Sequence, residues 1–246
     1  MYSENGQHSI DVCFSPLSYP IFEKADSVVV ITDIFRATTA IVAAFQNGVK
    51  SMIPVAAISE SEAFKAKGYI VAGERDGKKL DCADFGNSPF NFLEPSLKDQ
   101  TIVINTTNGT QAIQAAANGR NEVVIGAFTN LAAVARYVAS CEKNVVIFCA
   151  GWKSRFSMED SLFAGALTQK LVSDYPGVFH TVCDAAIASA DLWSLAAPDP
   201  LRYIEKAAHR HRLRRMGLDD VLEYCLTPDQ TDAVPVLRGI ELVKAG

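Results

Sequence analysis

The chain has 246 residues, 49% of them apolar, which is enough to bury a sizeable core in one large domain or two compact ones. Its formal net charge of -5 argues against a protein that binds nucleic acid regardless of sequence, because such a protein needs a basic surface. No run of about 20 apolar residues is present, and the N-terminal segment lacks the apolar core of a signal peptide. The six cysteines show no CxxC spacing. We therefore expect a cytoplasmic protein that binds neither nucleic acid nor a membrane.

Strand-like and helix-like segments alternate up to about residue 172, a pattern typical of a sheet covered by helices. Strands are expected at Ile10–Phe14, Val28–Thr32, Ser51–Val55, Tyr69–Ala72, Thr101–Ile104, Glu122–Ile125 and Asn144–Cys149. Helices are expected at Thr39–Gln46, Ser59–Lys67, Gln111–Ala117, Asn130–Ala139 and Glu159–Leu171, and the pattern after Tyr175 is mainly helical. These segments predict an α/β fold, with a largely parallel or mixed sheet layered between helices (α/β/α) and a helical C-terminal region. We treat residues 1–246 as one unit, with a sub-division near residues 120–145 as the alternative.

Two helix starts carry their own signals. Ser59 and Glu62 have the spacing of a capping box, and Thr38 or Thr39 is suited to cap the helix that follows the second strand. The stretch from Gly73 to Glu94 contains Gly, Asp, Asn and Pro throughout and is expected to be a long irregular loop. A loop of this length in a compact domain is more often functional than not.

The most informative stretch is the turn between the strand ending at Ile104 and the following helix. It carries hydroxyl and amide side chains and a glycine: Asn105, Thr106, Thr107, Asn108, Gly109 and Thr110. The free N–H groups of a helix start bind anions. Asp33 and Arg36 occupy the corresponding turn after the earlier strand, followed by Thr38 and Thr39. The two turns predict a site for a phosphorylated ligand, with a carboxylate available to a metal ion.

Polar residues follow several other predicted strands. Ligands of open α/β sheets gather beyond the carboxyl ends of the strands, so these residues are candidates for the same site. They are Glu74, Arg75, Thr129, Asn130, Gly151, Lys153, Arg155, Glu159 and Asp160. Carboxylates beside hydroxyl and guanidinium groups fit Mg2+ holding a phosphate. The four histidines lie outside this set, and the basic run 209–215 is expected to be a solvated helix face, with a subunit contact or an anion site as the alternatives.

At this point the chain resembles the magnesium-dependent 2-phosphosulfolactate phosphatases of coenzyme M and sulfolactate metabolism. The resemblance is carried by five blocks that occur in order, namely Asp33–Thr39, Gly73–Arg75, Asp84–Pro89, Thr106–Thr110 and Cys149–Gly151 followed by Glu159–Asp160. It implies hydrolysis of 2-phosphosulfolactate, or a similar small 2-phospho acid, to sulfolactate and phosphate. It also implies Mg2+ and an α/β fold with two related halves. A homo-oligomer is left open.

The predicted roles fall into three groups. Asp33, Arg36 and Glu74 are the expected catalytic residues, and the expected metal ligands are Asp33, Glu74, Asp84, Glu159 and Asp160. Arg36 and the Thr106–Thr110 turn are expected to bind the phosphoryl oxygens, with Thr38, Thr39, Asn87 and Ser88 as further contacts. Asn87 and Ser88 also fit a simple helix start before Pro89. Arg75, Lys153 and Arg155 are expected to meet the sulfonate and carboxylate, because a guanidinium fork suits a planar carboxylate.

Two alternatives differ in class. A dinucleotide-dependent oxidoreductase would share the alternating pattern, but no GxGxxG follows any predicted strand. A non-catalytic binder of small phosphorylated metabolites stays open, because anion-binding turns do not by themselves prove turnover. Whether Asp33 attacks phosphorus or only binds metal is also open. The second aspartate typical of Asp-nucleophile phosphatases is replaced here by Phe35.

Overall fold

The computed structural model describes residues 6–117 and 119–246. Residues 1–5, which open the segment expected to carry no signal peptide, lie outside the described residues. The described strands form one 11-stranded sheet. They are β1 His8–Cys13, β2 Val28–Thr32, β3 Ser51–Pro54, β4 Ile70–Arg75, β5 Lys78–Lys79, β6 Thr101–Asn105, β7 Glu122–Ile125, β8 Val145–Cys149, β9 Phe179–His180, β10 Pro235–Arg238 and β11 Glu241–Lys244.

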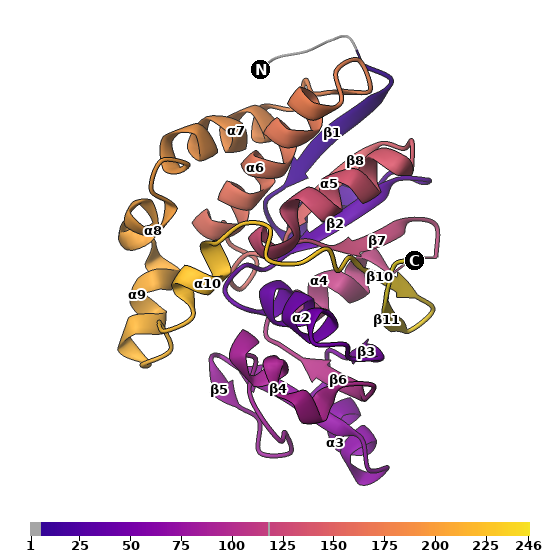
Figure 1. Ribbon diagram of the computed structural model, residues 1–246, viewed down its shortest axis with the longest axis vertical. Helices are drawn as coiled ribbons and strands as arrows, with labels where there is room; N and C mark the ends of the chain where they lie inside the picture. Colours follow the sequence, from indigo (N-terminus) through magenta and orange to yellow (C-terminus); the bar gives the residue numbers. More distant parts are fainter. Residues whose placement is uncertain (1–5, 118) are drawn as a thin grey trace.

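The sheet is mixed, with the strand order β5-β4-β6-β3-β11-β10-β7-β2-β8-β1-β9. One set of parallel strands contains β4, β6 and β3, and a second contains β7, β2, β8, β1 and β9. The C-terminal hairpin of β10 and β11 lies between the two sets (Figure 1) and pairs antiparallel with β7 on one side and β3 on the other. The last strands of the sequence therefore stand in the middle of the sheet.

Helices cover the sheet and make up most of the chain between β9 and β10. The α-helices are α1 Tyr19–Phe22, α2 Ala37–Gln46, α3 Ile58–Ala66, α4 Gly109–Ala116, α5 Leu131–Ser140, α6 Met158–Asp174, α7 Asp184–Ala196, α8 Pro200–Tyr203, α9 Ala208–Arg215 and α10 Leu222–Leu226. Short 3-10 helices occur at η1 Pro16–Ser18, η2 Pro89–Leu93, η3 Pro95–Leu97, η4 Phe128–Asn130 and η5 Ile204–Lys206. Figure 1 shows α6 and α7 side by side near β1, while α8, α9 and α10 form a group at one end of the strands.

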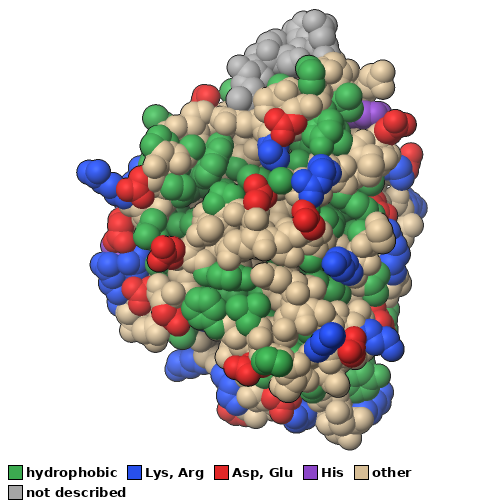
Figure 2. Space-filling model, viewed as in Figure 1, with side chains coloured by type: hydrophobic (Ala, Val, Ile, Leu, Met, Phe, Trp, Pro, Cys, Tyr) green, Lys and Arg blue, Asp and Glu red, His purple; other side chains and the backbone are tan. Residues whose placement is uncertain are grey.

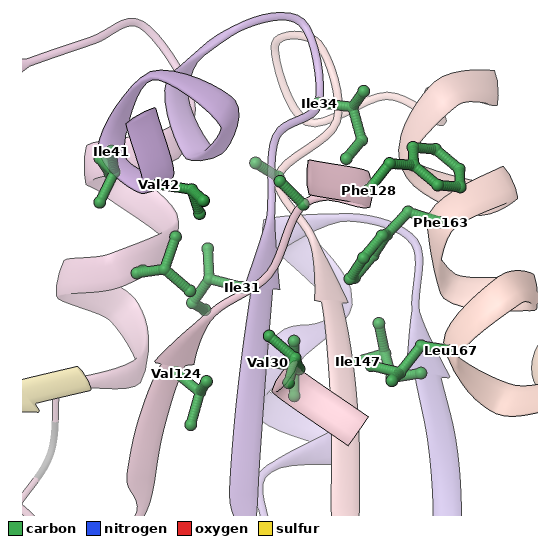
Figure 3. Packing of buried hydrophobic residues seen from close by; sticks show 14 of the residues in the cluster. Val30, Ile31, Ile34, Ile41, Val42, Val124, Phe128, Ile147, Phe163 and Leu167 are labelled. Carbon is green, nitrogen blue, oxygen red and sulfur yellow. The ribbon is translucent and has the colours of Figure 1, made fainter. Parts of the chain in front are cut away.

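Strand β2 and helix α2 lie in the core. Every residue of β2 is buried, as is every residue of α2 from 37 to 45. A strand covered by helices on both faces carries a continuous apolar run instead of an alternating one, which is why this strand was predictable. Figure 3 shows helix α2, with Ile41, packed over the end of β2 that carries Ile31. It also shows Phe163 of α6 beside the strands that carry Val30 and Ile147.

The predicted α/β fold, with helices layered on a mixed sheet, is confirmed. The prediction of a helical C-terminal region is correct for α7 to α10, but the hairpin of β10 and β11 was not predicted. Its signal was a pair of apolar runs on either side of Arg238 and Gly239, the latter at φ 61°. Among the described residues, no helix is long and apolar enough to cross a membrane. The two related halves and the division near residues 120–145 stay predictions.

The expected capping box at Ser59 and Glu62 is wrong. Ala57 has an extended backbone and is the N-cap residue, so α3 begins at Ile58, one residue before the expected start at Ser59. The side chain of Glu60 then accepts a hydrogen bond from the N–H of Ala57, at 2.8 Å. The reciprocal bond of a full capping box, from the N–H of Glu60 to a side chain at residue 57, has no acceptor because residue 57 is alanine.

Candidate active site

A cleft of about 240 Å³ lies where the turns after β2, β6 and β8 meet the end of β4 and the helix α9. The strand side of the cleft is formed by Asp33, Arg36, Glu74, Asn87 and Asn108. These residues come from segments far apart in the sequence. The prediction that the polar turns converge on one place is therefore correct for these five side chains.

The turn after β2 places Asp33 close to the N-terminus of α2. The N–H of Asp33 donates to the hydroxyl of Thr38 at 3.0 Å, and the hydroxyl of Thr39 donates to the carbonyl of Ile34 at 3.0 Å. Arg36 is the N-cap residue, so Thr38 and Thr39 lie inside the first turn of the helix, where both are fully buried. The prediction that either threonine caps this helix is wrong, because both hydroxyls bond back to the strand-end turn.

Asp160, in the first turn of α6, connects two strand-end turns. One carboxylate oxygen accepts from the N–H of Ile34 at 2.9 Å, and the other accepts from the N–H of Gly151 at 3.0 Å. Burial beside Glu159 and Asp33 raises the pKa of Asp160, while the two N–H groups act in the opposite direction. The side chain thus holds the β2 turn against the β8 turn.

Glu74, near the end of β4, makes the corresponding connection to the turn after β6. Its Oε1 accepts from the N–H of Thr107 at 2.7 Å. Its Oε2 accepts from the Thr107 hydroxyl at 3.0 Å and from the N–H of Gly77 at 2.6 Å. Since both oxygens are engaged, Glu74 fixes the shape of the cleft wall.

Thr106 and Thr110 cap α4 reciprocally. The N–H of Thr110 donates to the hydroxyl of Thr106, and the N–H of Thr106 donates to the hydroxyl of Thr110, both at 3.1 Å. Both residues are buried and do not line the cleft. Gly109 allows the turn to approach Asp33, because a Cβ there would lie 2.6 Å from the Ala37 Cβ and 3.0 Å from a carboxylate oxygen of Asp33.

Asp33 has the most perturbed environment of the carboxyl groups that line the cleft. It is 6% exposed. Burial raises its pKa to about 7, with the negative charges of Glu74 and Glu159 adding to the effect and His209 opposing it. A carboxyl group poised near neutrality can exchange a proton with water or respond strongly to a bound cation.

Glu159 and His209 form a buried pair beside Asp33. The Nδ1 of His209 lies 2.5 Å from the Oε1 of Glu159, and the second oxygen of Glu159 has no hydrogen-bond partner among the described residues. Burial disfavours the Glu159 carboxylate, but the hydrogen bond and charge of His209 outweigh it and lower its pKa. The bond at Nδ1 leaves the Nε2 of His209 available for a ligand. The expectation that no histidine belongs to the site is wrong.

Arg36 and Asn87 present unused polar atoms. Within the described part of the chain, no hydrogen bond or ion pair engages the guanidinium of Arg36, although the residue is only 6% exposed. Burial lowers its pKa, opposed by Glu74 and Asp33 among other groups. The side-chain oxygen of Asn87 is also buried without a partner. A buried cation without a fixed partner is suited to receive an anion.

The basic run 209–215 is a solvated helix face only in part, since His211, Arg214 and Arg215 are exposed. His209, Arg212 and Arg215 line the cleft together with Leu213 and Met216. These residues recur at three- and four-residue spacing, so they share one face of α9. That periodicity was readable in the sequence, but the assignment required knowing that α9 lies against the strand ends.

Several other predicted residues lie elsewhere. Asp84 pairs with Lys65 at 2.5 Å and accepts from the N–H of Val71, away from the cleft. Arg75 donates to the carbonyls of Ala56 and Thr106 and to the side chain of Asn105, so its fork is occupied.

Lys153, Arg155 and Ser88 also stand outside the main cleft. Lys153 pairs with Asp76 at 2.8 Å beside a neighbouring depression, and Arg155 lines a second cavity behind Trp152. Ser88 starts η2 without a side-chain cap, in front of Pro89 as the sequence indicated. Trp152 itself lines the cleft and was missed, although it follows Gly151 directly.

Among the described residues, no three His, Cys, Asp or Glu side chains are grouped so as to bind a metal ion together. Mg2+ is commonly held by one or two carboxylates, with water and substrate phosphate completing its shell. The Asp33 carboxylate and the unpartnered oxygen of Asn87, both in the cleft, are donors of this type. The arrangement combines clustered carboxylates, a buried guanidinium and a histidine, which suits acid–base chemistry on an anionic ligand.

Comparison with known proteins agrees with this geometry. The model of the 2-phosphosulpholactate phosphatase family matches residues 14–239. A probable 2-phosphosulfolactate phosphatase of Caldanaerobacter subterraneus subsp. tengcongensis is 36% identical over 216 residues, covering 85% of this chain and 87% of the relative. Another of that name, from Thermotoga maritima, is 35% identical over 237 residues, covering 96% and 98%. The chain therefore belongs to the 2-phosphosulpholactate phosphatase family.

Proposed function

We propose that this protein is a cytoplasmic phosphatase that hydrolyses 2-phosphosulfolactate, or a similar small 2-phospho acid, to sulfolactate and phosphate with the help of Mg2+. The observation that carries the proposal is the buried guanidinium of Arg36, which has no fixed partner among the described residues and lines the same cleft as Asp33 and His209. The names of the relatives supply the substrate.

In this proposal the guanidinium of Arg36 binds the phosphoryl oxygens. A charge-assisted contact in a buried site is stronger than one in water, and it positions phosphorus for attack. Neutralisation of the phosphoryl charge is the main catalytic contribution in phosphoryl transfer. The unpartnered oxygen of Asn87 and the Asp33 carboxylate are the candidate ligands for Mg2+, which supplies further charge neutralisation when bound.

His209 is the proposed general acid. As water attacks phosphorus, the bond between phosphorus and the C2 oxygen breaks, and the proton on the Nε2 of His209 passes to that leaving oxygen. Glu159 holds the ring through Nδ1, which leaves Nε2 for the leaving oxygen. The attacking water must lose its own proton to a different group, which lies on the side of phosphorus opposite the leaving oxygen.

Asp33 can act there in two ways. As a general base it accepts the proton of the attacking water. As a nucleophile it forms a bond to phosphorus, and water then cleaves the resulting acyl phosphate. Rapid quenching during turnover separates the two, because the nucleophilic route leaves a base-labile phosphoenzyme and the other leaves none.

Phosphate release from a panel of small 2-phospho acids tests the proposed function. We expect the fastest release from 2-phosphosulfolactate, supported by Mg2+ and abolished by a chelator. If 2-phosphosulfolactate and Mg2+ raise the melting temperature but no phosphate is released, the protein is a binder of phosphorylated metabolites and the proposal is wrong. If the chelator does not change the rate of phosphate release, only the Mg2+ dependence in the proposal is wrong.

A further inference from the structure

The basic helix α9 divides its side chains between two faces. Arg210 and Arg214, four residues apart, share one face and are paired with acidic neighbours. Arg210 lies 2.9 Å from Glu205 and 2.8 Å from Asp219, and Arg214 lies 3.4 Å from Glu205. These two arginines fasten α9 to the segments before and after it.

Arg212 and Arg215 are not used in this way. Within residues 6–117 and 119–246, neither forms an ion pair, and both line the cleft. The Nε of Arg212 is buried and has no hydrogen-bond partner. Glu159, the acid whose charge acts on Arg212, is already bonded to His209. The two cations therefore line the cleft without an ion-pair partner among the described residues.

Arg212 is also held in place. Its guanidinium carbon lies 4.2 Å from the centre of the Trp152 ring, so the planar group rests on an aromatic face. Figure 2 shows Lys and Arg side chains, with acidic ones among them, gathered at the edge of the molecule where Figure 1 places α9. A stacked guanidinium loses less freedom on binding a ligand than a free one, which suits it for recognition.

We propose that Arg212, stacked on Trp152 and assisted by Arg215, forms the subsite that binds the second anionic group of the substrate, a sulfonate or carboxylate on the carbon chain that carries the phosphate. This inference rests on the proposed function for the identity of the reacting group. It replaces the earlier expectation that Arg75, Lys153 and Arg155 meet these groups, since Arg75 is occupied by carbonyl oxygens.

The position of the two arginines distinguishes this role from phosphoryl binding. Arg36 stands in the turn after β2 next to Asp33, whereas Arg212 and Arg215 come from α9. A substrate that bridges the two sides must carry anions at both ends. A cleft of about 240 Å³ has room for a three-carbon acid of this kind. The α9 side then selects for the second anion, and the strand side binds the phosphoryl group.

Steady-state kinetics on three probes test this subsite. The probes are 2-phosphosulfolactate, 2-phospholactate and isopropyl phosphate, which carry two, one and no anionic groups besides the phosphate. We expect Arg212→Gln to raise KM for 2-phosphosulfolactate by about 10- to 100-fold with kcat within about threefold. The change in KM is expected to be smaller for 2-phospholactate and about twofold or less for isopropyl phosphate. Arg212→Lys keeps the charge without the fork and should restore part of the affinity.

Arg214→Gln is the matched control, because Arg214 lies on the same helix but is paired with Glu205 and Asp219. The inference is overturned if Arg212→Gln raises KM no more than Arg214→Gln does, or raises it equally for all three probes. If the wild-type protein cleaves none of the probes, the proposed function fails, and calorimetric titration with 2-phosphosulfolactate still tests the subsite. Equal affinity of the wild-type and Arg212→Gln proteins would then refute it.

Discussion

The two sides of the cleft are built in different ways. On the strand side, the carboxylates of Glu74 and Asp160 accept hydrogen bonds from backbone N–H groups, which fixes one turn against the next. On the α9 side, Arg212 and Arg215 rest on aromatic or open surface with no ion pairs among the described residues. The carboxylates of the strand side are thus fixed by backbone hydrogen bonds around the single guanidinium of Arg36, whereas α9 presents two arginines to the cleft.

This contrast suggests a division of labour. Catalysis needs groups fixed to a fraction of an ångström, and backbone hydrogen bonds supply such fixation. Recognition of a charged substituent needs donors that are not already satisfied. We therefore expect substitution of Asp33, on the strand side, to change kcat, and substitution of Arg212 or Arg215, on α9, to change KM.

The largest effect is expected at Asp33. Asp33→Asn removes the group poised to act as base, nucleophile or metal ligand, so kcat should fall by about 1,000-fold or more with little change in KM. Asp84→Asn is the control, because Asp84 pairs with Lys65 outside the cleft and its loss should leave kcat within about twofold. Equal losses in the two variants, measured by phosphate release, would remove Asp33 from the reaction.

A smaller loss is expected at His209, the residue through which α9 reaches the strand side. His209→Gln removes the proposed acid and leaves the Glu159 carboxylate buried without its partner, so kcat should fall by about 100-fold. His211→Gln, on the exposed side of the same helix, should retain wild-type kcat. If a substrate with a good leaving group, such as p-nitrophenyl phosphate, loses as much activity as 2-phosphosulfolactate in His209→Gln, His209 is not the acid.

Gly109→Ala should disturb the strand side without removing any polar group. The new Cβ would lie 2.6 Å from that of Ala37 and 3.0 Å from Asp33, so the turn must shift. We expect a loss of about 1–3 kcal/mol in the free energy of unfolding and a fall in kcat of about tenfold. Gly86→Ala, where an added Cβ meets nothing within 4 Å, should unfold like the wild type. Matching unfolding curves for all three proteins would contradict the close packing of this turn.

The smallest effect concerns stability. In the folded protein the pKa of Asp33 is raised to about 7 from an ordinary value of 3.8, so folding takes up a proton between these values. Stability from this group is therefore greatest at low pH and is lost as pH rises from about 4 to 7. In the presence of a chelator, Asp33→Asn should raise the melting temperature at pH 8 and change it little at pH 4.

The carboxyl group of Asp84 should change stability with pH in the opposite direction, so Asp84→Asn is the reference variant for that measurement. Burial alone would raise its pKa, but the hydrogen bonds from Lys65 and Val71 and the nearby lysine charges lower it overall. Asp84→Asn should therefore lose stability at neutral pH, with the loss disappearing as pH falls through the acidic range. An Asp33→Asn protein that is destabilised at pH 8 would show that the carboxyl of Asp33 is not strained by burial.

The sequence predicted the strand side better than the α9 side, for a physical reason. Val28–Thr32 is a short, continuous apolar run of the kind found in buried strands, so Asp33 is expected directly after the end of a strand. The contribution of α9 depends on how a helix far along the chain docks, which no local pattern encodes. His209 and Arg212 were therefore missed as site residues, although their spacing along the helix was visible.

The prediction of Thr106–Thr110 as an anion site shows a different limit. The hydroxyl-rich composition was read correctly as a helix start, but Thr106 and Thr110 form hydrogen bonds to each other's backbone groups and are buried outside the cleft. Composition identifies which groups are available in a turn. It does not tell which of them remain free after the turn has closed.

The most direct test of the divided cleft compares Asp33→Asn and Arg212→Gln side by side on 2-phosphosulfolactate. We expect Asp33→Asn to lower kcat by about 1,000-fold with KM within about threefold, and Arg212→Gln to raise KM by at least about tenfold with kcat within about threefold. If both substitutions change the same parameter to a similar extent, catalysis and recognition are not separated between the two sides.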